Sequence, residues 1–139
     1  MNKNVIIYTD GGSRGNPGEA AYGFFISDAE KKEIAKVGRR LGIKTNNYAE
    51  YMAVISALRW IQENYKPYPS KIDIYLDSQL IERQMKGQYK IKEETLRSLF
   101  FTAHELMRSL GSEITFTHVP REQNKIADSM VNAALDNKI

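Results

Sequence analysis

Two short apolar segments that end in the same way constrain the fold most. Val5–Thr9 and Ile72–Leu76 are predicted to be strands, and each is followed directly by an aspartate, Asp10 or Asp77. A long segment of helical character lies between them, and a crossover of this kind places two strands side by side in parallel. The two aspartates are therefore expected together at the carboxyl-terminal edge of the sheet, where open α/β sheets bind ligands.

The other elements follow from the spacing of the apolar side chains. Residues 10–18, DGGSRGNPG, are expected to form a loop because glycine, asparagine and proline dominate them. Three antiparallel strands followed by β/α alternation predict an α/β fold with a five-stranded mixed sheet and helices packed on it. The remaining expected strands are Ala20–Ser27, Glu33–Leu41 and Glu113–Val119, and the expected helices are Asn47–Asn64, Gln79–Lys86, Glu93–Ser109 and Lys125–Leu135.

Composition limits the classes of function. The 139 residues fit one domain, and 42% hydrophobic with 27% charged residues is ordinary for a globular protein. Cysteine is absent, which excludes disulfides, thiolate catalysis and cysteine-ligated zinc. No apolar run approaches the roughly 18 residues of a membrane span, and the N-terminus does not resemble a signal peptide. We therefore expect a cytoplasmic protein with no membrane partner. A net charge of +3 permits a polyanionic partner without requiring one.

Two more acidic side chains can join the aspartates at the sheet edge. Glu50 lies in the first turn of the central predicted helix, and Asp128 lies in the first turn of the last one. Ionised carboxylates at one edge repel each other unless a cation or a shared proton intervenes, and a set of hard oxygen ligands suits Mg²⁺ or Mn²⁺. A second interpretation stays open at this point, in which Glu50 and Asp128 only complement the helix dipoles.

The glycine-rich segment 10–18 also has competing interpretations. Its backbone amides could cradle a phosphate, or it could be a plain turn between strands. It lacks the GK[ST] ending of the NTPase phosphate loop and the G-x-G-x-x-G spacing of dinucleotide-binding folds, so neither of those classes is expected. The segment alone does not choose between the first two interpretations.

Four segments form a set that covers nearly the whole chain: TDGGSRGNPG (9–18), TNNYAEYMAVISAL (45–58), YLDSQLI (75–81) and REQNKIADSMVNAAL (121–135). Together and in this order they resemble the type 1 ribonuclease H family, the ribonuclease HI proteins. The resemblance implies one ribonuclease H-like catalytic domain over residues 1–139, with helices on both faces of its sheet. It also implies an endoribonuclease that cleaves the RNA strand of RNA–DNA hybrids by two-metal-ion hydrolysis, giving 5′-phosphate and 3′-hydroxyl ends.

Residue by residue, the resemblance assigns catalysis and metal binding to four acids, which are those reached above from strand ends and helix starts. They are Asp10, Glu50, Asp77 and Asp128. By analogy Asp10 bridges two Mg²⁺ ions, and Asp128 helps to hold the ion on the side of the nucleophile. Glu50 and Asp77 then hold the ion on the side of the leaving group, and Mn²⁺ can substitute for Mg²⁺.

The resemblance further implies contacts with the hybrid. Amide side chains and closely approached backbone can bond to the 2′-hydroxyl that distinguishes RNA from DNA, and Thr45 matches a family position that grips a phosphate of the DNA strand. The alternative for residues 45–47 is helix capping, since Thr and Asn are common caps. The expected substrate-binding residues are Gly11, Gly12, Asn16, Thr45, Asn46, Asn47 and Gln79.

The chain departs from the family pattern in two regions. The arginine that usually accompanies Thr45 is Ile43 here, and Lys44 is its expected substitute. Residues 85–92 are too short for the basic helix and loop of many bacterial members, which is typical of the compact archaeal-like subgroup without this protrusion. Basic residues gather instead at Lys31–Thr45 and at positions 86, 90 and 92. These lysines and arginines either contact phosphates or only solvate a surface strand.

Side chains outside the four acids have assigned places as well. Arg121 and Glu122, in the short connection before the last helix, are expected near the metals in an auxiliary role. His118 is assigned to the last strand as a hydrogen-bonded structural residue, and His104 to a structural place inside a helix.

Three classes of function remain open from the sequence. The leading one is a Mg²⁺-dependent ribonuclease acting on an RNA–DNA hybrid duplex, as a monomer, with duplex RNA as an additional substrate left open. A related metal nuclease or phosphatase on the same sheet is the second, because fold does not fix substrate. The third is a catalytically inactive binding module, against which the retention of all four acids argues.

Overall fold

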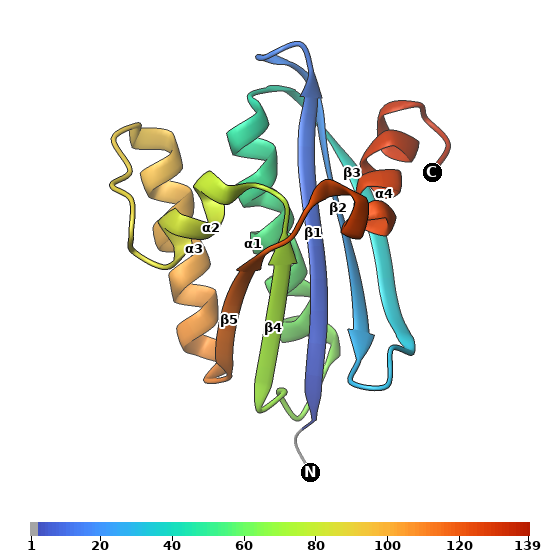
Figure 1. The fold of residues 1–139 in the computed structure, drawn as a ribbon, viewed down its shortest axis with the longest axis vertical. Coiled ribbons are helices and arrows are strands. Elements are labelled where there is room, and N and C mark those ends of the chain that lie inside the picture. The colour runs from blue at the N-terminus through green and yellow to red at the C-terminus, as the bar shows by residue number, and fades with distance from the viewer. Residues whose placement is uncertain (1–2) are drawn as a thin grey trace.

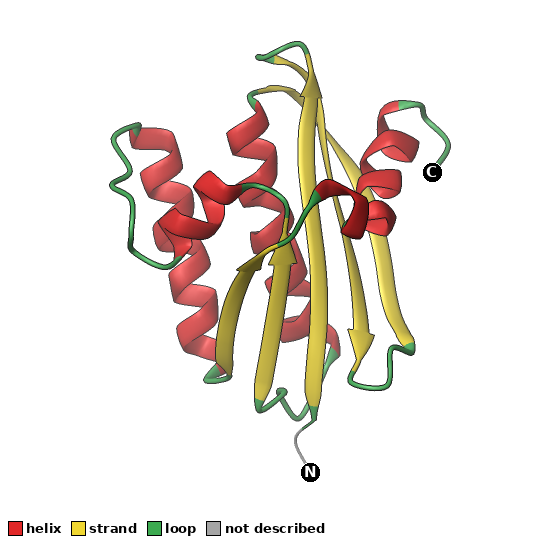
Figure 2. Cartoon of the chain, viewed as in Figure 1, coloured by secondary structure: helices red, strands yellow, loops and turns green. Residues whose placement is uncertain are grey.

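The computed structural model describes residues 3–139, which form a five-stranded sheet between helices (Figure 1, Figure 2). The strands lie in the order β3-β2-β1-β4-β5; β1 to β3 are antiparallel neighbours, and β4 and β5 run parallel to β1. This confirms the predicted α/β class and mixed sheet. The strands are β1 (Asn4–Arg14), β2 (Gly18–Asp28), β3 (Glu33–Lys44), β4 (Lys71–Leu76) and β5 (Glu113–His118). The helices are α1 (Asn46–Asn64), α2 (Gln79–Met85), α3 (Glu94–Leu110), the 3₁₀ turn η1 (Arg121–Gln123) and α4 (Lys125–Leu135).

The sheet separates two helical layers, which confirms helices on both faces. α1 and α3 pack together behind the sheet in the view of Figure 1, and α4 lies in front of it. Side chains alternate along each strand. In β1, Val5 and Ile7 are buried on the side of α1, whereas Asp10 pairs with Gly23 on the side of α4. We call these the α1 face and the α4 face.

The predicted loop at residues 10–18 is wrong. β1 continues through these residues to Arg14, paired with β2 down to the Arg14–Glu19 pair, and only residues 15–17 form the turn. Gly11, at the start of this segment, is needed for close packing rather than for a turn. A side chain at Gly11 would collide with the α1 backbone at Ala49, so glycine here lets the helix lie directly on the strand.

The central helix α1 covers most of the α1 face of the sheet. Its nineteen residues begin after the cap Thr45, and one long side is fully buried, including Tyr51, Leu58 and Ile61. Burial of this many apolar side chains is the main favourable term for the fold. Within residues 3–139 no helix combines the length and apolarity needed to span a bilayer.

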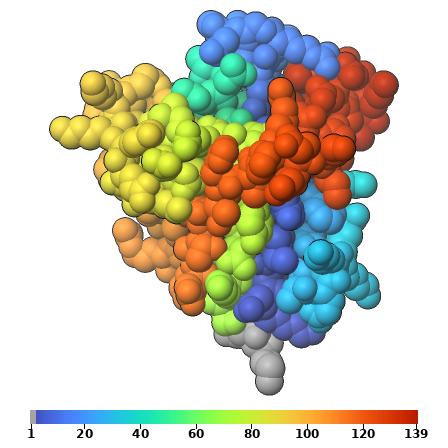
Figure 3. Space-filling view, in the orientation of Figure 1, coloured from blue at the N-terminus to red at the C-terminus, as the bar shows by residue number. Residues whose placement is uncertain are grey.

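α4 approaches its own face just as closely, but over a smaller area. A Cβ at Gly23 would lie 2.6 Å from the Ala127 carbonyl oxygen and 2.8 Å from the Met130 Cβ. A Cβ at Gly38 in β3 would lie 3.0 Å from the Met130 carbonyl carbon. Figure 3 shows the η1–α4 segment crossing the upper part of this face, while the strands below it stay at the surface.

Adding one methyl group at Gly23 should therefore destabilise the protein. We expect Gly23→Ala to lower the free energy of unfolding by about 1–3 kcal/mol, because the new Cβ forces α4 off the sheet. Gly12→Ala is the matched control: its Cβ would meet only the Asn46 Oδ1 at 3.9 Å, so its stability should equal or exceed that of the wild type. Urea unfolding measures both variants, and equal stabilities would contradict the close packing of α4.

Candidate active site

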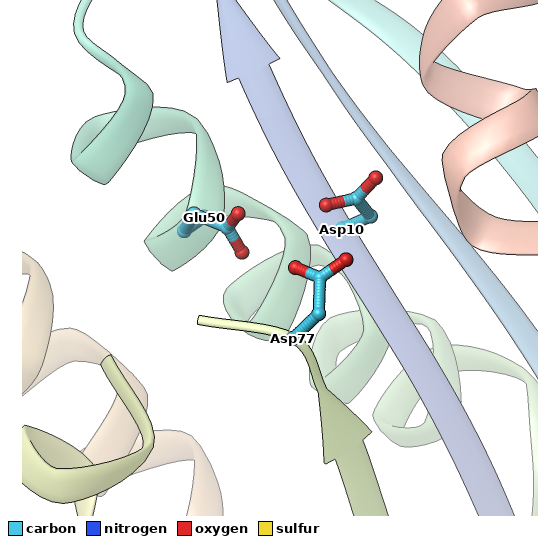
Figure 4. Close-up of side chains that lie close together, drawn as sticks. All are labelled: Asp10, Glu50 and Asp77. Carbon is cyan, nitrogen blue, oxygen red and sulfur yellow. The ribbon is translucent and has the colours of Figure 1, made fainter. Parts of the chain in front are cut away.

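Three acidic side chains from distant parts of the chain converge at one end of the sheet. Asp10 comes from β1, Glu50 from the second turn of α1 rather than the predicted first turn, and Asp77 from the residue after β4. Figure 4 shows the three side chains pointing toward one another. One carboxylate oxygen from each lies within 4.8 Å of the others. The predicted convergence of the two strand-end aspartates is thus observed, with Glu50 beside them.

The sheet register produces this arrangement. β1 and β4 pair in parallel up to Thr9 and Leu76, so Asp10 and Asp77 are the next residues on each side. β4 stops there while β1 runs on, which leaves room beside Asp10. Glu50 enters that room from α1, because the helix backbone next to it packs on Gly11. Both Asp10 and Glu50 are buried, 6% and 8% exposed.

Asp128 joins this cluster from α4 on the other side. Its carboxyl group lies within hydrogen-bonding reach of Asp10, and the Asn132 Nδ2 donates to its Oδ2 at 3.5 Å. Asn124, just before α4, donates from Nδ2 to the Thr9 carbonyl oxygen at 2.8 Å and so fixes the start of the helix against β1. Asn124 is 1% exposed, and sequence reasoning missed it; its only signal is its position at the helix start four residues before Asp128.

Burial and mutual repulsion make this cluster costly in the absence of a cation. Burial, followed by the Asp77 charge and by Asp128, raises the pKa of Asp10 from 3.8 to about 8. Burial, followed by the charges of Asp10 and Asp77, also raises the pKa of Glu50 well above its ordinary value. The Gly11 amide donates toward both carboxylates and pulls their pKa values down, but the raising effects are larger.

The donor set fits a divalent metal ion. Carboxylate oxygens are the ligands that Mg²⁺ and Mn²⁺ prefer. The Glu50 Oε2 is buried with no hydrogen-bond partner, which is an expensive state for a carboxylate oxygen unless a cation satisfies it. Asp10, Glu50 and Asp77 form the tight group that can hold an ion, and Asp128 lies next to Asp10 outside that group.

The carboxylates open into a pocket of about 440 Å³, which we call the acidic pocket. Arg121 from η1 faces into it, whereas Glu122 lines a different pocket beneath η1. Neighbouring residues of a 3₁₀ turn point to different sides, so the two expected auxiliary residues are separated. The pocket is lined by Asp10, Glu50, Asp77, Asp128, Gly11, Gly12, Ser13, Arg14, Asn46, Arg121, Val131, Asn132 and Leu135.

The asparagines expected to contact substrate tie the β1–β2 hairpin to α1. The Asn46 Oδ1 accepts hydrogen bonds from the Ser13 backbone N–H at 2.8 Å and from the Ser13 Oγ at 3.0 Å. The Asn46 backbone N–H donates to the Asn16 Oδ1 at 3.0 Å. Thr45 caps α1, because its Oγ1 accepts from the Tyr48 N–H at 3.1 Å. The capping interpretation of Thr45 is therefore observed, alongside its exposed position.

Thr45 also lines a second pocket, of about 510 Å³, which we call the α1-end pocket. Asn16, Asn47 and Lys44 share its wall, and the Lys44 ammonium lies 4.6 Å above the Tyr48 ring. The pocket contains one acid, Glu93, whose carboxylate is occupied in capping α3. A phosphate bound in this pocket would therefore contact Lys44, the residue expected to substitute for the family arginine that is Ile43 here.

Besides Glu122, three more residues named in the sequence analysis lie outside both pockets. Gln79 is exposed at the first residue of α2, whose cap is Ser78. His118 is the last residue of β5, as predicted, but its side chain is exposed and makes none of the expected hydrogen bonds within the described part of the chain. His104 is half-buried in α3 and packs against Phe100 with ring centroids 4.2 Å apart, as a structural residue would.

Comparison with known proteins supports one family. The model of the RNase H family matches residues 2–136. Ribonuclease HI of Halobacterium salinarum is 39% identical over 132 residues, which are 95% of this chain and 64% of that protein. A bifunctional protein of Mycobacterium tuberculosis is 37% identical over 133 residues, 95% of this chain and 35% of that protein. The chain therefore spans one to two thirds of these relatives.

Solved structures give the same result for the fold. The crystal structure of RNase H1 from Halobacterium salinarum superposes with a TM-score of 0.88 at 38% identity, covering 96% of this chain and 98% of that one. LC11-RNase H1, isolated from compost by a metagenomic approach, was crystallised in complex with an RNA/DNA hybrid. That complex superposes with a TM-score of 0.92 at 41% identity, covering 96% of this chain and 98% of that one.

Removing one charge from the cluster should stabilise the metal-free protein. The pKa of Asp10 rises from 3.8 to about 8 on folding, so the unfolded chain releases this proton first and the free energy of unfolding falls as the pH rises between these values. We expect Asp10→Asn to flatten this slope. At about pH 8, the free energy of unfolding of Asp10→Asn should exceed that of the wild type by at least about 1 kcal/mol, because one pKa unit is worth about 1.4 kcal/mol.

Urea unfolding in chelator across this pH range measures the effect. Asp73→Asn, which removes a half-buried carboxylate from the same face outside the cluster, should keep the wild-type slope. An Asp10→Asn protein that is less stable than the wild type at about pH 8 would contradict the claim that the ionised Asp10 destabilises the metal-free protein.

Proposed function

Because the chain belongs to the RNase H family, we propose that it is a ribonuclease H, an endonuclease that hydrolyses the RNA strand of RNA–DNA hybrids. The observation that carries the proposal is the convergence of the buried Asp10 and Glu50 with the half-buried Asp77 within 4.8 Å, joined by Asp128. The fold around them matches LC11-RNase H1, which was crystallised with such a hybrid, at 41% identity. Cleavage leaves 5′-phosphate and 3′-hydroxyl ends.

Asp10, Glu50, Asp77 and Asp128 would hold two Mg²⁺ ions, with Mn²⁺ as a substitute. Two such ions stabilise the attacking and the leaving oxygens of an in-line displacement and supply hydroxide near neutral pH. The chain contributes the geometry: β1, β4 and α1 hold three carboxylates together against their repulsion, and Asn124 keeps Asp128 next to them. The Gly11 amide favours the ionised, metal-binding form of Asp10 and Glu50, because it lowers the pKa of both carboxyl groups.

The hybrid would be held along the amino-terminal end of α1. Helix amino termini attract phosphates through their free N–H groups and the helix dipole, and Thr45 with Lys44 lines the α1-end pocket for a phosphate of the DNA strand. The Asn16 Oδ1 is engaged by Asn46, which leaves the Asn16 amide nitrogen free to donate to a 2′-hydroxyl. Gly11, Gly12 and Asn46 line the acidic pocket and offer backbone and amide groups to the RNA strand. Asn47 and Gln79 are the outer contacts.

Arg121 is the auxiliary residue rather than Glu122. Arg121 lines the same pocket as the four carboxylates, where its guanidinium can bind the scissile phosphate or counter the negative charge of the cluster. Glu122 lines the pocket beneath η1 instead, so we assign it no such role.

Asp77→Asn tests the carboxylate cluster directly. We expect it to lower Mg²⁺-dependent cleavage of a labelled hybrid by at least about 1,000-fold, since bound metal supplies several kcal/mol to the transition state. Asp73→Asn is the matched control on the same strand and face. Its neighbour Thr115 donates to Oδ1, which an amide oxygen can replace, so its activity should stay at the wild-type level.

Gel assays compare hybrid, duplex RNA, duplex DNA and single strands, each with Mg²⁺, Mn²⁺ or chelator. Selective breakage of the RNA strand in the hybrid supports the proposal. Tight binding of the hybrid without breakage in either metal would identify an inactive binding module instead. Breakage of duplex RNA as well would extend the substrate range.

Arg121→Ala and Glu122→Ala separate the two neighbours. Loss of Arg121 should lower kcat/KM for the hybrid by about ten-fold or more, a size typical of groups around a metal centre. Glu122→Ala should match the wild type in the same steady-state assay. The opposite ranking of the two variants would show that Glu122 is the auxiliary residue.

Three expectations stay predictions: that residues 1–139 are one complete catalytic domain, that the protein acts as a monomer, and that it works in the cytoplasm. Since the chain spans 64% and 35% of the two relatives described above, the activity of those whole proteins is extended to this chain only as part of the proposal.

A further inference from the structure

A row of aromatic side chains crosses the α4 face directly beside the acidic residues. The strand register aligns Phe25 of β2, Tyr8 of β1 and Tyr75 of β4 in one line across the sheet. The rings of Tyr8 and Tyr75 stack with centroids 5.1 Å apart, and Phe25 lies 6.5 Å from Tyr8. We call these three residues the aromatic row. Asp10 and Asp77 are the next residues on the same face, two positions along each strand.

The aromatic row lies outside the cover of α4. The row closer to the helix consists of glycine and aspartate, because α4 packs on Gly23 and Gly38 there. All three aromatic side chains are only half-buried, and Figure 3 shows β1 and β4 at the surface below the η1–α4 segment. A row of three neighbouring aromatic rings left partly open to solvent is unusual for a face that only needs to fold.

Part of this surface is hollowed. Tyr8, Phe25 and Ile6 form one wall of a pocket of about 430 Å³, and residues 122–126 of η1 and α4 form the other. We call this pocket the slot. Its size is within the range of small-ligand sites. One wall carries two aromatic rings beside Ile6, and the other carries four polar residues beside Ile126, which suits a planar ring with polar edges.

The charge around the slot favours an anionic ligand. Lys31 and Lys125 line it from opposite sides against one acid, Glu122. Lys36 of β3 continues the line of the aromatic row beyond Phe25. Among the other acids on this face, Asp10 and Asp77 belong to the carboxylate cluster outside the slot, and Asp73 lies 3.9 Å from the Lys71 ammonium and accepts a hydrogen bond from Thr115. Lysine heads at the rim of a slot with aromatic walls would meet phosphates while a base occupies the interior.

We propose that the slot and the aromatic row bind an unpaired stretch of nucleic acid, with a base inserted against Tyr8 and Phe25 and its phosphates at Lys31 and Lys125. Aromatic stacking with a basic rim is the general means of binding single strands. A duplex keeps its bases stacked inside and offers no ring to the slot. The surface is continuous with the acidic pocket, so a single-stranded extension of a bound hybrid could reach it. This last step rests on the proposed function.

Fluorescence anisotropy with labelled oligothymidylate, in chelator, tests the slot without any cleavage. The wild type should bind the oligonucleotide, and Phe25→Leu should weaken the affinity at least about five-fold, the low end for loss of one stacking partner. Lys31→Glu, in an exposed turn, should weaken it as well and keeps the test valid if Phe25→Leu folds poorly. Phe101→Leu and Lys66→Glu make the same chemical changes at exposed sites elsewhere and should leave the affinity unchanged.

Hybrids with and without a single-stranded extension provide the second measurement. At least one of the four possible extensions, 5′ or 3′ on either strand, should increase affinity for the wild type. Phe25→Leu should remove that increase while blunt hybrid is cleaved at the wild-type rate. Absence of oligonucleotide binding, wild-type affinity in Phe25→Leu and Lys31→Glu, or self-association through this face in sedimentation would each overturn the proposal. Oligonucleotide binding without any hybrid cleavage would instead contradict the proposed function and leave the slot as a single-strand site.

Discussion

Electrostatic repulsion between three clustered carboxylates, two of them buried, is the constraint around which this structure is organised. Asp10, Glu50 and Asp77 bring one oxygen each within 4.8 Å, and burial raises the pKa of Asp10 to about 8. Ionised carboxylates this close repel one another, so flexible segments carrying them would move apart. They stay together because each is attached to a rigid element, and the elements are fixed by the packing of the sheet and α1. The cost falls on stability, and a bound cation would offset it.

Close backbone contact is what makes that attachment rigid. Glycine at position 11 lets α1 lie on β1, and glycine at position 23 lets α4 lie on β2. Beyond the part of the α4 face that α4 covers, the residues change from glycine and aspartate to the aromatic side chains of Tyr8, Phe25 and Tyr75. The face is thus divided by packing into a part under a helix, with the acids at its border, and an open part with aromatic rings.

The sequence predicted the parts of the site that depend on strand pairing. A crossover between two strands that both end in aspartate was enough to bring Asp10 and Asp77 together, and helix starts brought Glu50 and Asp128 forward. The extent of β1 was mispredicted, because glycines that accommodate a helix look the same as glycines that make a turn. Asn124 was missed because its hydrogen bond to the Thr9 carbonyl joins residues far apart in the chain. Arg121 and Glu122 line different pockets because they lie in one short 3₁₀ turn. A turn of three residues is too short to produce a periodic pattern of apolar side chains in the sequence.

Anomalous diffraction from crystals of the protein soaked in Mn²⁺ tests the central claim most directly. The account predicts a manganese peak bonded to carboxylate oxygens of Asp10, Glu50 and Asp77, and a second peak that includes Asp128 once a hybrid is bound. A soaked crystal with an active protein and no manganese between these carboxylates, or with the ion bound elsewhere, would contradict it.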